Sequence, residues 1–229
     1  MNTTRWAVMS DLEYRQEIVR IGKLLHDKGF IAATDGNISV RLNDYTVLST
    51  PTCMSKGMMT VEDLVTVDMR GKKLSGFREV SSEIGMHLMI YQERPDVNAI
   101  VHAHPPTATG FAAAGMALDQ ALVSEIVLSL GSVPLAEYGC PGTEELAEGL
   151  RPLVRNHDAA LMANHGVVAF ADDVLSAYMN METVEHFAKI ALVTHQLGCQ
   201  QPLSEQRVAR LRELRKKFQA MKVALKRTT

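Results

Sequence analysis

Two histidines separated by one residue, His102 and His104, are the first residues in this sequence whose type and spacing point to chemistry. They end a β-rich run over Val97–Ala103. Residues two apart in a strand point to the same face of a sheet, so both imidazoles can converge on one ion. Neutral imidazole is the commonest protein ligand for zinc and similar divalent ions. The pair predicts part of a metal site, although two polar positions on one strand face give the same pattern.

A third histidine, His165, is the candidate that completes the ligand set. It lies in Asn164-His165-Gly166, between two short apolar segments, where the glycine allows a tight turn. Three histidines on one metal leave an open coordination position, as catalytic zinc requires. The tripeptide by itself also fits an ordinary turn.

Glu83 is the candidate acid/base. It stands in the first turn of an expected helix over Ser81–Glu93, which Ser81 or Ser82 can cap. A carboxylate beside a bound metal can take up and return a proton. A glutamate in a first turn is also favoured by the helix dipole alone, so both interpretations stay open at this point.

Three short polar clusters could hold an anion. They are Gly36-Asn37, Thr50-Pro51-Thr52 and Ser81-Ser82. Hydroxyls, a side-chain amide and free backbone N–H groups can bind a phosphate without a fixed charge. The sequence has no Walker A motif and no dinucleotide fingerprint, so it gives no support to nucleotide chemistry.

These residues need a scaffold, and the hydrophobic pattern supplies alternating helices and short strands. Expected helices cover 10–28, 81–93, 107–114, 143–155, 172–195 and 205–226. Expected strands cover 40–42, 45–49, 64–68, 97–103, 133–137, 159–162 and 167–170. This mixture argues for an α/β or α+β layered architecture, and the absence of linkers and repeats predicts one domain over 1–229. The last helix is rich in Lys and Arg, which fits a solvated face or an anion contact.

Composition excludes several classes of protein. The chain has 229 residues, 46% of them hydrophobic and 22% charged, which is enough for a sizeable core. A net charge of −2 argues against a nucleic-acid partner, which needs a basic face. The first residues lack the apolar stretch of a signal peptide, no segment fits a membrane span, and three scattered cysteines suit a reducing compartment. We therefore expect a cytoplasmic protein. Its eight histidines are the one feature of the composition that calls for an explanation.

Taken in order, these segments resemble the class II aldolase/adducin family, within it the L-fuculose-1-phosphate aldolase-like branch. The matching segments are TDGNISVRL (34–42), LSTPT (48–52), SSE (81–83), MHLMIYQERPDVNAIVHAHP (86–105), PGTEELAE (141–148) and NHGVVAF (164–170). The resemblance implies an α/β fold, a three-layer αβα arrangement with a central, mainly antiparallel sheet. It also implies a homotetramer with active sites at subunit interfaces.

The resemblance further assigns roles to individual residues. His102, His104 and His165 would hold a divalent metal ion, zinc before manganese or cobalt, and Glu83 would be the catalytic acid/base. The implied phosphate-binding residues are Gly36, Asn37, Thr52, Cys53, Ser81 and Ser82. The other histidines receive ordinary surface or packing positions; His87, one helical turn after Glu83, could orient it, but a packed or exposed helix histidine is the plainer interpretation.

This sequence departs from the family pattern in two places. Cys53 stands where the family usually has glycine, and its backbone N–H can still donate there provided φ is negative. The family's fuculose phosphate aldolase uses two tyrosines near the aldehyde end, one of them near the C-terminus, and this chain has no tyrosine after Tyr178. Glu125 is the candidate for proton transfer at that end.

The resulting hypothesis is an aldolase that reversibly cleaves a ketose 1-phosphate to dihydroxyacetone phosphate and an aldehyde. Fuculose 1-phosphate and a 5-deoxy- or methylthio-pentulose 1-phosphate are the candidate substrates. One alternative is an epimerase, dehydratase or decarboxylase on the same scaffold; another is a non-catalytic, adducin-like interaction module. Glu83 favours the aldolase, since related pentulose-phosphate 4-epimerases typically carry aspartate there.

Overall fold

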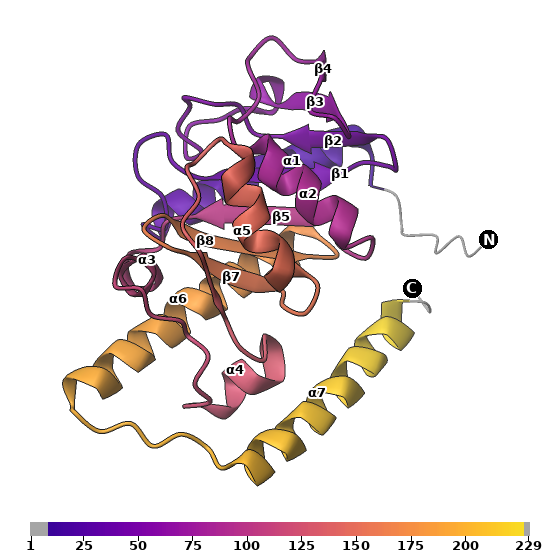
Figure 1. Ribbon diagram of the computed structural model, residues 1–229. Coiled ribbons are helices and arrows are strands. Elements are labelled where there is room, and N and C mark those ends of the chain that lie inside the picture. The colour runs from indigo at the N-terminus through magenta and orange to yellow at the C-terminus, as the bar shows by residue number, and fades with distance from the viewer. Residues whose placement is uncertain (1–8, 227–229) are drawn as a thin grey trace.

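The described strands form one sheet of eight strands, in the order β4-β3-β2-β1-β5-β8-β7-β6 (Figure 1). The computed structural model describes residues 9–226, so the ends of the expected domain, 1–8 and 227–229, lie outside it. The strands are β1 Asn37–Arg41, β2 Thr46–Ser49, β3 Val65–Asp68, β4 Lys73–Ser75, β5 Ala99–Ala103, β6 Leu135–Ala136, β7 Ala159–Met162 and β8 Gly166–Ala171. All neighbours pair antiparallel except β6 and β7, which confirms the mainly antiparallel sheet.

Helices cover both faces of this sheet, which confirms the three-layer α/β prediction. They are α1 Asp11–Asp27, the short 3₁₀ helix η1 Val61–Asp63, α2 Ile84–Glu93, α3 Pro106–Ala113, α4 Ser124–Ser129, α5 Glu144–Val154, α6 Val174–Gln196 and α7 Glu205–Lys226. Figure 1 shows α2 and α5 side by side in front of the sheet, with α6 behind it. None of the described helices is long and apolar enough to cross a membrane.

The alternation of side chains along the strands builds two cores. On β5, Val101 joins the cluster under α1, α3 and α6, while its neighbour Ile100 joins the cluster under α2 and α5. On β8, Val167 and Phe170 divide in the same way. Period-two alternation therefore buries both faces of the central strands, and the few polar residues on them stand out.

Six elements differ from the sequence-based expectations, among them β1, which begins at Asn37 and not at Val40, and η1, which was not expected. Helix α2 begins at Ile84, later than expected, with Glu83 at its N-cap position, and neither Ser81 nor Ser82 caps it. The Ser81 hydroxyl instead accepts the backbone N–H of Glu83, a local turn that competes with the helix. The expected strand 133–137 shrinks to the two residues of β6, and the sequence pattern missed β4 and α4, which are too short for a period to be recognised.

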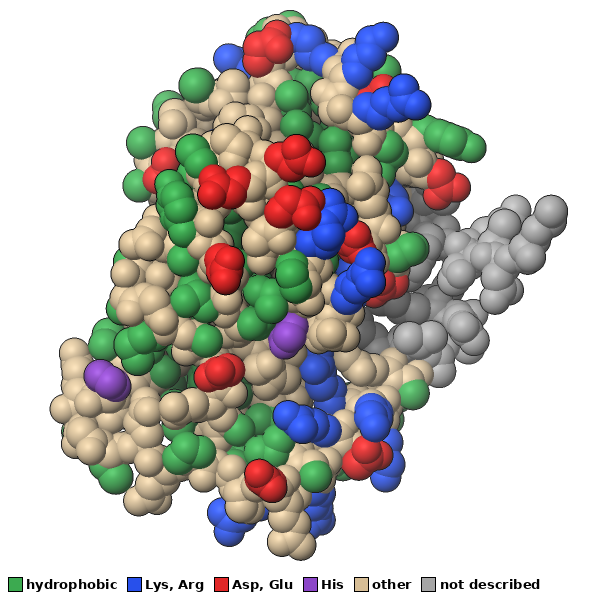
Figure 2. All heavy atoms as spheres, viewed as in Figure 1, with side chains coloured by type: hydrophobic (Ala, Val, Ile, Leu, Met, Phe, Trp, Pro, Cys, Tyr) green, Lys and Arg blue, Asp and Glu red, His purple; other side chains and the backbone are tan. Residues whose placement is uncertain are grey.

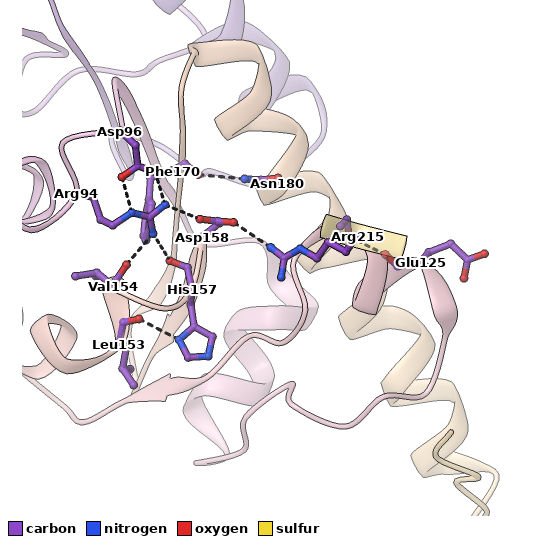
Figure 3. A network of polar contacts seen from close by, with 11 residues as sticks. Arg94, Asp96, Glu125, Leu153, Val154, His157, Asp158, Phe170, Asn180 and Arg215 are labelled. Carbon is purple, nitrogen blue, oxygen red and sulfur yellow. Dashed lines mark hydrogen bonds and ion pairs between the residues drawn. The ribbon is translucent and has the colours of Figure 1, made fainter. Parts of the chain in front are cut away.

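Helix α7 is fastened to the body by a network of ion pairs. Arg215 donates to Asp158, whose second oxygen accepts from Arg94 (Figure 3). Val208 and Leu211 pack against the core from the same helix. Figure 2 shows Lys and Arg side chains gathered around α7 at the lower right. The basic helix is therefore partly docked, and only its remaining charges form a solvated face.

Candidate active site

The site lies where β5 ends and β8 begins, two neighbouring strands of the sheet. His102 is in β5, paired in register with Asn37 of β1, and is fully buried. His104 follows the end of β5, and His165 occupies the turn that leads into β8. Glu185 on α6 accepts the N–H groups of Thr107 and Ala108 and so holds the start of α3 close behind His104. Two antiparallel strands and one turn thus bring together histidines more than sixty residues apart.

The three imidazoles His102, His104 and His165 converge on one point. Their ring centroids lie 4.9, 4.8 and 5.1 Å apart and the rings are inclined to each other by 61–64°. One nitrogen from each ring lies within 4.8 Å of the other two. This nearly threefold arrangement suits a divalent ion with three nitrogen ligands, and it is the arrangement that the sequence predicted.

Outer partners orient two of the three imidazoles, whereas Nδ1 of His165 is buried without a hydrogen bond to a described residue. Nδ1 of His102 lies 2.9 Å from the carbonyl oxygen of Val167 and must donate to it. Nδ1 of His104 faces a carboxylate oxygen of Asp35 at 3.4 Å. Nε2 of His102 therefore turns its lone pair inward, and it lies 3.1 Å from Nε2 of His104. Outer partners of this kind are typical of metal-binding histidines.

Burial favours the neutral form of His102 and His165. It lowers the pKa of His102 well below the usual value, and charge on His104 and His165 lowers it further. Burial also lowers the pKa of His165, against the opposing effect of Glu83. A neutral imidazole is the form that binds a metal ion, so the environment suits one.

Glu83 completes the cluster from the start of α2. Its two oxygens lie 3.3 Å from Nε2 of His102 and 3.2 Å from Nε2 of His165. Oε2 accepts from the Asn37 amide at 2.7 Å, whereas Oε1 is buried and accepts no hydrogen bond from a described residue. A carboxylate oxygen without a hydrogen bond, beside inward-facing imidazole nitrogens, fits a cation. No other group among the described residues accounts for this unpaired oxygen.

Two glycines make this approach possible. A Cβ at Gly166 would lie 2.5 Å from the ring of His104, and a Cβ at Gly36 would lie 2.7 Å from the carbonyl oxygen of His102. Gly36 also has φ near +69°, a conformation that favours glycine. Any larger residue at either position would push a histidine out of the cluster.

The three predicted phosphate segments meet beside Glu83. The Thr50 side chain accepts the N–H of Ile38, next to Asn37, and the Thr50 carbonyl accepts the N–H of Ser81. Thr52 is half-buried, whereas Ser82 is exposed. A cavity of about 490 Å³ borders Ser82 and Glu83 between the starts of α2 and α5, although the three histidines do not line it. The segments are therefore adjacent, as an anion site requires.

Cys53 overturns one expectation. Its φ is +54°, so the condition of a negative φ is wrong and the residue takes the left-handed conformation of the glycine it replaces. Ala33 and Asn164 are the other non-glycine residues with positive φ among those described, with φ of 47° and 55°. All three stand in loops of the site, before Gly36, after Thr52 and before His165.

Lys56 is a residue that sequence reasoning missed. Its ammonium group donates to the carbonyl oxygens of Thr34 and Met54, at 2.6 and 2.9 Å, and so joins the loop before Gly36 to the loop after Thr52. Burial lowers the pKa of Lys56 to about 8. A buried lysine would have drawn attention, because its charge needs partners. Nothing in the local sequence, however, marks this lysine as buried.

Glu125 does not join this group. It lies in the first turn of α4 with an exposed side chain, and no contact between its carboxylate and the histidine cluster occurs among the described residues. Figure 3 shows the carboxylate turned away from Arg215. A role for Glu125 at this site would require a second subunit.

Comparison with known proteins agrees with this geometry. The model of the class II aldolase and adducin N-terminal domain matches residues 16–192. The chain is 33% identical over 196 residues to a 3-oxo-tetronate 4-phosphate decarboxylase of Pectobacterium atrosepticum, covering 84% of this chain and 89% of that protein. It is 33% identical over 207 residues to a 5-deoxy-D-ribulose 1-phosphate aldolase of Bacillus thuringiensis serovar kurstaki, covering 90% and 95%. A solved L-fuculose 1-phosphate aldolase superimposes with a TM-score of 0.85 at 33% identity, covering 92% and 99%.

Proposed function

Because the chain belongs to the class II aldolase and adducin family, we propose that it is a divalent-metal-dependent aldolase acting on a ketose 1-phosphate. The products are dihydroxyacetone phosphate and an aldehyde, and the substrates we favour are fuculose 1-phosphate and a 5-deoxy- or methylthio-pentulose 1-phosphate. The observation that carries the proposal is the orphaned Glu83 oxygen beside three converging imidazoles. We assign the metal to His102, His104 and His165, with zinc as the first candidate before manganese and cobalt.

Once bound, a divalent ion at these nitrogens would supply positive charge that stabilises the electron-rich species left by carbon–carbon cleavage. Glu83 supplies the proton. When the C3–C4 bond breaks, its electron pair stays on the dihydroxyacetone phosphate half, and C3 must then be protonated. The Oε1 atom of Glu83 is free of hydrogen bonds and suits this transfer, whereas Oε2 is held by Asn37.

The polar loops hold the part of the substrate that does not react. We assign the phosphate to the backbone and hydroxyl groups around Gly36, Thr52, Cys53, Ser81 and Ser82. The Asn37 side chain is already engaged by Glu83 and His87, so only its backbone remains for the phosphate. Lys56 holds the two loops in place from behind.

The proton of the C4 hydroxyl needs a separate acceptor. Since Glu125 is remote from the cluster within one subunit, we propose that the protein forms a homotetramer in which a neighbouring copy completes this end of the site. Large exposed apolar side chains at Tyr45, Met58 and Phe77, each at least 70% exposed, support such an assembly.

A decarboxylase is the second candidate, and the position of Glu125 favours it. Loss of carbon dioxide from a 3-oxo-tetronate 4-phosphate also leaves an electron pair on a carbon of dihydroxyacetone phosphate, which one acid can protonate. This reaction needs no acceptor for a hydroxyl proton. The same Glu83 would therefore be sufficient.

One experiment tests the proposal and separates the two reactions. The purified protein is loaded with zinc and its metal content is quantified. Release of dihydroxyacetone phosphate is then measured from ketose 1-phosphates and from 3-oxo-tetronate 4-phosphate, with the aldehyde or carbon dioxide identified. Chelation and His102→Ala should abolish release and Glu83→Gln should lower it about 100-fold or more, while His186→Ala, at an exposed histidine on α6, should leave it unchanged. A protein that binds no added divalent metal would overturn the proposal.

A further inference from the structure

A row of buried polar side chains runs from Glu83 into the molecule, away from the histidine cluster. Glu83, His87 and Tyr91 are spaced by four residues, so they form one stripe from the N-cap of α2 along the helix. Asn37 and Ser39 alternate on β1 and face this stripe. All five are buried, His87 and Tyr91 to 1% exposure.

The contacts are continuous along the row. The Asn37 amide nitrogen lies 2.7 Å from Oε2 of Glu83, and its oxygen lies 2.5 Å from Nε2 of His87. Nδ1 of His87 lies 2.6 Å from the hydroxyl of Ser39, which lies 2.8 Å from the hydroxyl of Tyr91. The Tyr91 hydroxyl also reaches the carbonyl oxygen of Asn98 at a longer 3.5 Å.

Only one arrangement of protons satisfies this row. The carbonyl oxygen of Asn37 can only accept, so Nε2 of His87 donates to it. Burial lowers the pKa of His87 to about 3, so the ring carries a single proton and its Nδ1 accepts from Ser39. Because the Ser39 hydroxyl proton is donated to His87, the Ser39 oxygen accepts the hydrogen bond of the Tyr91 hydroxyl. Every donor points towards Glu83.

The direction matters because the two ends of an asparagine amide are nearly equal in size. With Asn37 rotated by half a turn about its last bond, its oxygen would face the Glu83 carboxylate and its NH₂ would face a ring N–H. Both contacts would be repulsive. His87 therefore determines which end of the Asn37 amide faces the Glu83 carboxylate.

We propose that His87 is a positioning residue for Glu83: as the Nε2–H tautomer, fixed by Ser39 and Tyr91, it turns the Asn37 amide so that one carboxylate oxygen is held and the other faces the reacting carbon. The inference rests on the proposed catalytic role of Glu83. His87 contacts neither a metal-ligating histidine nor the phosphate loops directly, so its effect passes through Asn37.

The kinetic test compares two substitutions at the same position. In the zinc-loaded enzyme, His87→Leu removes the donor and should lower kcat on the order of 10–100-fold, the usual effect of losing an outer-shell partner. KM and metal content should stay near the wild-type values. His87→Gln places an amide N–H at similar reach and should recover most of kcat, although it cannot also contact Ser39.

A control separates positioning from stability. Leu150→Ala truncates a fully buried residue on α5, outside the row, and should lower the melting temperature at least as far as His87→Leu with kcat unchanged. Equal kcat in His87→Leu and wild type would overturn the inference. So would a loss in Leu150→Ala as large as that in His87→Leu.

A spectroscopic measurement stands apart from turnover. Nitrogen-15 NMR of the wild-type protein with labelled histidines should show His87 with a protonated Nε2 and an unprotonated Nδ1. The His87 signals are identified as those that are missing from the spectrum of the His87→Gln variant. Protonation at Nδ1 would refute the row even in an active enzyme. A wild-type protein without turnover on any substrate would refute the proposed function. The tautomer of His87 would still show whether the hydrogen bonds of the row run in the inferred direction.

Discussion

Two clusters of ionisable side chains in this protein differ in how their atoms are paired. In the candidate site, some polar atoms are buried without partners. Glu83 Oε1 and His165 Nδ1 form no hydrogen bond with a described residue, and Nε2 of His102 and His104 lie 3.1 Å apart. Burying unpaired atoms is costly, because each loses water and gains no partner in return.

The cluster that fastens α7 has the opposite character (Figure 3). Arg94 directs its N–H groups to both oxygens of Asp96, to Asp158, and to the carbonyl oxygens of Val154 and His157, all within 2.8–3.1 Å. The hydrogen bonds to Asp96, together with those to Asp158, raise the pKa of Arg94 above its already high value. Here every oxygen of the Asp96 and Asp158 carboxylates accepts from a guanidinium group. The exception among the donors is Nε of Arg215, which is buried without an acceptor, and a cavity of about 540 Å³ borders the network.

The contrast separates a chemical site from a structural one. A network that serves only the fold satisfies its donors and acceptors internally. A network that serves chemistry keeps some of them unsatisfied and pays for this with rigid support, here the outer contacts of His102 and His104 and the row behind Glu83. Mutations should therefore affect activity in one cluster and stability in the other.

The largest expected effect is at Glu83. Glu83→Gln keeps an acceptor for the Asn37 amide and adds an N–H that an imidazole nitrogen can accept, but it cannot transfer the proton. We expect kcat to fall about 10²–10⁴-fold, the usual contribution of an acid/base. The free energy of unfolding of the metal-free protein should stay within about 1 kcal/mol of the wild type. Steady-state kinetics and urea titration of the same preparation measure both; a large loss of stability with activity retained would erase the contrast.

The corresponding substitution in the α7 network is Asp158→Ala, which should affect stability and not activity. It leaves the guanidinium groups of Arg94 and Arg215, which are 16% and 21% exposed, without a shared carboxylate. We expect the free energy of unfolding to fall by about 2–3 kcal/mol, less than for a wholly buried pair because water screens part of the charge. Glu213→Ala removes the partner of Lys216 on the exposed side of α7, where water screens the pair, and should lower the free energy of unfolding far less than Asp158→Ala does. Turnover per folded molecule should be unchanged in both.

A pH titration of stability tests the buried row behind Glu83, which supports the candidate site and not the α7 network. Because burial lowers the pKa of His87 to about 3, only the unfolded protein takes up this proton between pH 6.5 and pH 3. The free energy of unfolding therefore falls as the pH drops through this window. His87→Gln should remove up to about 1.4 kcal/mol per pH unit of that slope. Urea midpoints of metal-free wild type and variant from pH 4 to pH 7 give the difference, and parallel curves would contradict it.

Much of the fold was predictable because strong local patterns and tertiary packing agree. The expected helix 205–226 matches α7, and β7 matches its expected strand, since long periodic or bounded apolar segments leave little choice. The elements that were missed, such as α4 and β4, are short, and only tertiary contacts define them. The shifted start of α2 reflects competition from the Ser81 turn, which a capping rule does not weigh.

The candidate site divides in the same way. The residues predicted as ligands carry a distinctive type, and the structure brings His102, His104 and His165 together as expected. Lys56 and Tyr91 were missed because their place depends on which loops and helices meet, information that no local motif contains. His87 was noticed for its spacing from Glu83, but its partners on β1 come from a strand nearly fifty residues away.

The smallest expected effect concerns the backbone of the site. Among the described residues, the non-glycine residues with positive φ all belong to the site loops, and none belongs to the α7 network. Cys53 is the most direct test, since its φ of +54° costs an L-residue about 1–2 kcal/mol. Cys53→Gly should remove this strain but add unfolded-state entropy, for a net gain of about 0.5–1 kcal/mol in the free energy of unfolding. Cys53→Ala keeps the Cβ and should give no such gain. If alanine stabilises as much as glycine, the thiol and not the backbone is the cause, and strain would no longer distinguish the site from the network.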